Sequence, residues 1–126
     1  MTTPSDLPHP STILAGLKDF QRATVDYVYR RLYEDSDPVD RFLIADEVGL
    51  GKTLVARGVI AKAVDKLRRG GIQRIDIIYI CANRDIARQN INRLNFTGQV
   101  DVAIATRMTL LPLHLHSLQN SPINFV

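Results

Sequence analysis

The sequence predicts an α/β domain in which a parallel sheet is flanked by helices. Short apolar runs alternate with stretches of ten or more residues whose apolar positions have helical spacing. This alternation is typical of parallel strands joined by right-handed crossover helices. The run at residues 75–82 is almost continuously apolar and rich in isoleucine, which is typical of a strand covered on both faces. A glycine-bearing loop with Gly-Lys-Thr joins the first apolar run to a long helical stretch.

The N-terminal part is expected to hold a lead-in and one amphipathic helix. Residues 1–16 contain three prolines and little periodicity, so an extended lead-in is predicted before a domain at 17–126. Apolar residues then recur at near-helical spacing, which predicts a helix over 17–33. The acidic segment 34–38 ends in proline and should end this helix.

The remaining elements follow in alternation. Helices are predicted at residues 53–69, 84–94 and 108–118, the last weakened by Pro112. Strands are predicted at residues 41–45, 75–82 and 100–105, with a fourth beginning at 123.

Ligands of parallel sheets lie at the carboxyl ends of the strands. The glycine-bearing loop, residues 82–84 and residues 106–107 should therefore meet at one edge of the sheet.

Composition sets broad limits on location and partners. A chain of 126 residues suits one domain or part of one. The net charge of +3 permits nucleic-acid contact without indicating it. Cys81 is the single cysteine and lies in an apolar run, so a buried thiol and a reducing, intracellular setting are expected. No leader peptide or apolar run of membrane-spanning length is found, so no membrane partner is expected.

The loop at residues 45–53 has the features of a phosphate-binding loop. Strand, glycine-bearing loop, Gly-Lys-Thr and helix is the context that such a loop needs. Gly49 and Gly51 reach backbone angles closed to other residues and let phosphate oxygens approach. Lys52 can pair with the β- and γ-phosphates, and the Thr53 hydroxyl can bind Mg²⁺. The helix adds its positive N-terminal end. The loop therefore predicts a site for a nucleoside triphosphate with Mg²⁺.

One residue departs from the strict loop pattern G-x-x-x-x-G-K-[ST]. Asp46 stands where that pattern has its first glycine. The alternative interpretation is a turn of small residues that leads into a helix, with Lys52 merely solvated.

The run Asp-Glu-Val-Gly-Leu-Gly-Lys-Thr at residues 46–53 resembles motif I of superfamily 2 helicases and translocases. Asp-Glu-x-Gly-Leu-Gly-Lys-Thr is the usual form in their Swi/Snf-like branch. The resemblance implies an incomplete P-loop NTPase sheet of the RecA-like kind, with ATP and Mg²⁺ as cofactors. It implies catalytic roles for Lys52 and Thr53 and a metal-binding role for Thr53. The implied phosphate-binding residues are Asp46, Glu47, Val48, Gly49, Leu50, Gly51, Lys52 and Thr53.

Three further segments support the resemblance. Residues 17–21 resemble the upstream segment of the family, which implies that Gln21 recognises adenine. Residues 79–84 resemble motif Ia, which implies that Asn83 and Arg84 face nucleic acid. Residues 101–111 are similar to the strand and turn that precede the Asp-Glu-x-His box. Asn83 departs from the family's usual proline pattern, and Asn90 stands where a tryptophan commonly follows the glutamine.

The sequence lacks the parts that hydrolysis requires. ATP hydrolysis needs a carboxylate that holds Mg²⁺ and orients water, and an arginine that stabilises developing charge. No Asp-Glu-x-His box, second RecA-like lobe or arginine finger follows. The chain is therefore expected to be the N-terminal part of a larger ATP-dependent helicase or translocase, inactive in hydrolysis alone. The expected partners are nucleic acid, with DNA favoured over RNA, and a second RecA-like lobe.

Other interpretations remain open at this stage. The chain could be a phosphate-loop module of another class that does not act on nucleic acid, or a remnant without function. A GTPase would need a base-reading Asn-Lys-x-Asp segment, and the sequence has none. Gln21 could be a solvated glutamine on a polar helix face. The arginines at 84, 88 and 93 could form a solvated face.

Overall fold

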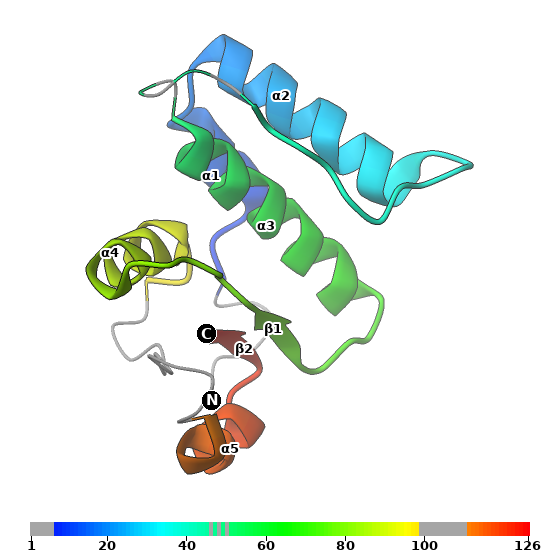
Figure 1. Cartoon of the computed structure of the whole chain (residues 1–126). Coiled ribbons are helices and arrows are strands. Elements are labelled where there is room, and N and C mark those ends of the chain that lie inside the picture. Colours follow the sequence, from blue (N-terminus) through cyan, green and yellow to red (C-terminus); the bar gives the residue numbers. More distant parts are fainter. Residues whose placement is uncertain (1–6, 46, 48, 50, 99–110) are drawn as a thin grey trace.

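The computed structural model describes residues 7–45, 47, 49, 51–98 and 111–126. Its described elements are mainly helices, and its two short strands, one from the middle of the chain and one next to the C-terminus, lie side by side (Figure 1). In chain order they are α1 (Pro10–Ala15), α2 (Asp19–Tyr29), the π-helical turn η2 (Arg30–Glu34), α3 (Lys52–Arg69), β1 (Ile75–Ile77), α4 (Arg84–Leu94), α5 (Leu111–Asn120) and β2 (Ile123–Phe125).

The two most regular predicted helices are confirmed. Helix α4 has the predicted bounds, and α3 begins one residue earlier than expected. Asn83 caps α4, because its Oδ1 accepts the N–H groups of Asp85 at 2.9 Å and Ile86 at 3.1 Å. Helix α5 occupies most of the predicted 108–118 segment, although residues 108–110 lie outside the described part of the chain.

The N-terminal helices differ from the prediction in two ways. The lead-in expected to be extended contains α1, which begins with proline and is capped by His9, whose Nδ1 accepts the Ser11 N–H at 3.2 Å. The helix expected over 17–33 is α2 followed by the wider turn η2.

Helices α2 and α3 pack closely because glycine lies at their contact. A Cβ on Gly58 would lie 2.8 Å from Cγ2 of Val25 and 3.2 Å from Cδ2 of Leu14, so no larger residue fits without a shift. An ion pair joins the same helices farther along, between Lys62 Nζ and Asp26 Oδ1 at 2.8 Å. The start of α3 is therefore held against the start of α2.

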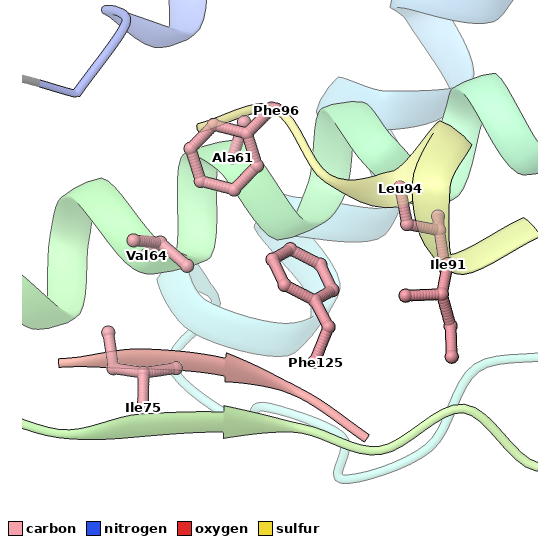
Figure 2. Close-up of a cluster of buried hydrophobic side chains, with 7 residues drawn as sticks. All are labelled: Ala61, Val64, Ile75, Ile91, Leu94, Phe96 and Phe125. Atoms are coloured by element: carbon pink, nitrogen blue, oxygen red, sulfur yellow. The ribbon is translucent and has the colours of Figure 1, made fainter. Parts of the chain in front are cut away.

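The main core lies between α3, α4 and the strands. Phe125 points from β2 into the middle of this cluster (Figure 2). The buried members are Ala61, Val64, Ile75, Ile91, Leu94, Phe96 and Phe125.

The two strands are parallel, as expected for an α/β domain. Ile75 pairs with Ile123, and Ile77 pairs with Phe125. The pairing continues past β1, because the Tyr79 N–H donates to the Val126 carbonyl at 2.7 Å. The strand predicted to begin at 123 is confirmed. The larger RecA-like sheet stays a prediction, since the expected strand at 100–105 lies outside the described residues.

Two strand predictions need correction. Residues 41–45 form no strand and instead lie along α2. There the Phe42 ring packs edge-on against the Tyr27 ring, with 5.8 Å between the ring centroids. The run at 75–82 is a strand only over β1, and the side chains of Ile78 and Ile80 are 68% and 89% exposed.

Cys81, expected to be buried, is exposed. Coverage on both faces needs partner strands and helices on each side. The described residues supply β2 alone as a partner of β1.

A buried amide fastens the strands to α5. Asn124 is 2% exposed, and its Nδ2 donates to Asp76 Oδ1 and the Leu118 carbonyl, both at 2.9 Å. Burial raises the pKa of Asp76, but hydrogen bonds from Arg74 and Asn124 outweigh it, so the pKa lies below its ordinary value.

This lowered pKa predicts a pH dependence of stability. The contribution of Asp76 is present above its unfolded pKa of about 3.9 and is lost as the pH falls through the lower folded pKa. We expect the free energy of unfolding to decrease below about pH 4, and to decrease less in Asp76→Asn. Urea unfolding near neutral pH and in acid measures how steeply the free energy of unfolding changes with pH in each protein. Identical slopes for the two proteins would contradict the assignment.

Candidate nucleotide-binding site

Two glycines of the loop before α3 have the left-handed backbone expected from the sequence. Gly49 has φ +91° and Gly51 has φ +81°, in the left-handed region that other residues rarely adopt. The predicted ligands Asp46, Val48 and Leu50 lie outside the described residues.

The N-terminus of α3 offers backbone donors to an anion. Gly51 stands at the N-cap position and has no side chain that could accept a hydrogen bond from the first turn. Its carbonyl accepts the N–H groups of Leu54 at 2.9 Å and Val55 at 3.1 Å. The earlier N–H groups of a helix have no partner within the helix and favour anions.

The structure brings Gln21 to this loop. Gln21 is 5% exposed, and a Cβ added to Gly51 would overlap its Nε2 atom. Its Oε1 accepts the Lys18 N–H at 2.9 Å, which fixes the amide against the start of α2. The interpretation of Gln21 as a solvated surface residue is therefore wrong. Two segments far apart in the sequence meet at the two residues predicted to bind base and phosphate.

Lys52 lies across the loop. Its Nζ donates to the Glu47 carbonyl at 3.1 Å, so the amine folds back over the residues that precede the helix. Thr53 follows in the first turn of α3 and is half-buried. The arrangement gathers a cation, a hydroxyl and the helix N-terminus within one turn, beside the Gln21 amide.

Metal binding here would depend on few protein atoms. No group of three or more histidine, cysteine, aspartate or glutamate residues that could hold a metal occurs in the part of the chain that the structure describes. Mg²⁺ at phosphate-binding loops is bound mainly by phosphate oxygens and water. The role of Thr53 as a ligand of Mg²⁺ stays a prediction.

The second predicted region is the start of α4. Asn83 caps this helix through its side-chain oxygen, a role signalled by an asparagine directly before the helical pattern. Arg84 is exposed, and so is Arg88 one turn later. Asn90 donates to the Tyr79 hydroxyl at 2.8 Å and ties α4 to the chain after β1. Residues 106–107, predicted to join this edge, lie outside the described residues.

Comparison with family models, with curated proteins and with solved structures finds no match to this chain.

Among the described helices, none combines the length and the apolar character that crossing a membrane would need.

Proposed function

We propose that this chain binds ATP with Mg²⁺ at the loop before α3. The observation that supports this most strongly is the contact between Gln21 and Gly51. A solvated turn of small residues would not require a buried glutamine amide at its last glycine. The left-handed glycines and the Lys52 amine over the loop support the same function.

Each residue has a role in this proposal. The N–H groups at the start of α3 bind phosphate oxygens, and the Lys52 amine leaves the Glu47 carbonyl to pair with the β- and γ-phosphates. The Thr53 hydroxyl holds Mg²⁺. The Gln21 amide carries both a donor and an acceptor, which match the N7 acceptor and N6 donor of adenine. Guanine presents an acceptor in place of that donor, so ATP should bind better than GTP.

We further propose that the chain is the ATP-binding portion of a nucleic-acid helicase or translocase of the Swi/Snf-like kind. Hydrolysis would then need the missing carboxylate box and an arginine from a second RecA-like lobe. Closure of the two lobes over ATP would change the grip on the strand. The chain alone should bind ATP without turning it over.

A Gln21→Glu variant tests the base-reading role. Glutamate keeps an oxygen that can accept the Lys18 N–H but loses the amide donor to adenine N7. We expect the preference for ATP over GTP to fall by about ten-fold, because a base-specific pair of hydrogen bonds contributes about 1–3 kcal/mol. Titration calorimetry with Mg-ATP and Mg-GTP measures the ratio of the two affinities.

The ratio separates two effects of the new carboxylate. Charge repulsion with the triphosphate lowers the affinities for ATP and GTP equally and leaves the ratio of the two affinities unchanged. An unchanged ratio would therefore remove Gln21 from base recognition, whatever happens to the affinities.

The exposed arginines of α4 support the nucleic-acid part of the proposal. Arg84 and Arg88 lie four residues apart and so occupy one side of the helix. We expect Arg84→Gln with Arg88→Gln to weaken DNA binding. The salt dependence of the affinity should also become less steep, by the amount that corresponds to the loss of about two phosphate contacts. Fluorescence anisotropy with DNA and RNA oligonucleotides over a range of salt measures this.

Arg93→Gln is the matched control for that experiment. Arg93 is exposed on the same helix but points to a different side, because helical residues advance 3.6 per turn. The control removes one positive charge and the double variant removes two, so equal losses of binding free energy per charge would mean that only net charge matters.

A further inference from the structure

A hollow lies at the C-terminal half of α3, away from the glycine-rich loop. Its volume is about 390 Å³, within the range of small-molecule sites. Its floor is formed by Ala61 and Val64 of α3 and by Phe96, which are all buried members of the main core (Figure 2). Its polar wall is formed by Asp65, Arg68 and Arg69 of α3 and by His9.

The charges of this wall are not balanced. Arg69 Nη2 pairs with Asp65 Oδ2 at 3.0 Å, so those two charges largely cancel. Arg68 makes no ion pair with any residue that the structure describes, and its side chain is half-buried. Among the residues that the structure describes, the hollow therefore joins an apolar floor to one guanidinium, that of Arg68, without an ion-pair partner.

His9 adds a second donor at the hollow. Its Nδ1 accepts the Ser11 N–H at 3.2 Å, which leaves Nε2 as the ring nitrogen that can donate to a ligand. A guanidinium and an imidazole N–H beside an apolar floor suit an anion attached to an apolar body. A carboxylate or phosphate would pair with Arg68, since guanidinium binds both through parallel hydrogen bonds.

We infer that this hollow binds a small molecule made of an apolar ring or chain and one anionic group. The Phe96 ring and the aliphatic floor bury the body, and Arg68 with His9 holds the anion. The site lies roughly 20 Å along α3 from the glycine-rich loop, given the rise of a helix. It does not depend on the proposed ATP site.

The test compares a matched pair of probes. We expect 1-naphthylacetate to bind the full 126-residue chain and to shift the amide NMR signals of residues at the hollow. Its neutral amide, 1-naphthylacetamide, should bind about ten-fold more weakly, because it lacks the charge-assisted contact. Arg68→Gln should reduce the affinity for the acid to that of the amide, and Arg41→Gln, at an exposed arginine outside the hollow, should not.

Each outcome decides between chemistries. Tighter binding of 1-naphthyl phosphate than of the acetate assigns the hollow to phosphate ligands, and the reverse assigns it to carboxylates. Equal affinities for acid and amide, or full affinity in Arg68→Gln, would overturn the inference. Signal shifts spread evenly over the chain would also overturn it.

Discussion

Replacing Lys52 with alanine is expected to abolish measurable binding of Mg-ATP. The lysine amine lies over the loop and supplies the positive charge nearest to the expected β- and γ-phosphates. Losing its charge-assisted contacts should weaken binding by about 100-fold or more. The folded structure should persist, because in this structure the amine makes a hydrogen bond at the protein surface. Titration calorimetry with Mg-ATP measures the loss.

Lys66→Ala provides the control for this change. Lys66 lies near the other end of the same helix, and its Nζ donates to the Tyr33 carbonyl at 3.1 Å. We expect it to leave ATP affinity unchanged. An unchanged affinity in Lys52→Ala would remove the loop from nucleotide binding.

Gly51→Ala is expected to have the second large effect. Its Cβ would overlap the Gln21 amide, and the φ of +81° disfavours alanine by about 1 kcal/mol. The loop must therefore move away from Gln21 or change its backbone. Either change displaces the N–H groups that we propose to bind the phosphates, so ATP affinity should fall by about 100-fold.

Alanine variants at two other glycines distinguish the effect of a steric overlap from the effect of backbone strain. Gly49 and Gly71 also have positive φ, but an added Cβ would meet nothing within 4 Å at either position. Gly71→Ala should show the cost of strain in chemical denaturation and keep ATP affinity. Gly49→Ala should weaken binding less than Gly51→Ala. Full affinity in Gly51→Ala would contradict the proposed contact with Gln21.

Local signals predicted several elements correctly. The bounds of α4 and the C-terminal end of α3 agree with the helical spacing of their apolar residues. The positive φ of Gly49 and Gly51 was expected from the glycine positions in the loop. These features depend on residues close together in the chain, so the sequence alone determines them.

Long-range features were predicted less well. The exposure of Ile80 and Cys81 depends on which segments cover the chain after β1, which periodicity cannot report. The burial of Gln21 follows from the approach of α3 to α2, made close by Gly58. A polar helix position gave no sign of it, and only the family resemblance pointed to this residue. The prolines near α1 predict an extended chain by composition, but proline is also favoured in a first helical turn, where Pro10 lies.

The most direct test of the proposed function is an NMR titration of the ¹⁵N-labelled chain with Mg-ATP. We expect four signals to shift together with one affinity, those of the backbone amides of Gly49, Gly51 and Lys52 and of the side-chain amide of Gln21. Mg-GTP should move the Gln21 signal less than Mg-ATP does. Unchanged signals at these four residues with millimolar Mg-ATP, while the chain remains folded, would contradict the proposed nucleotide site.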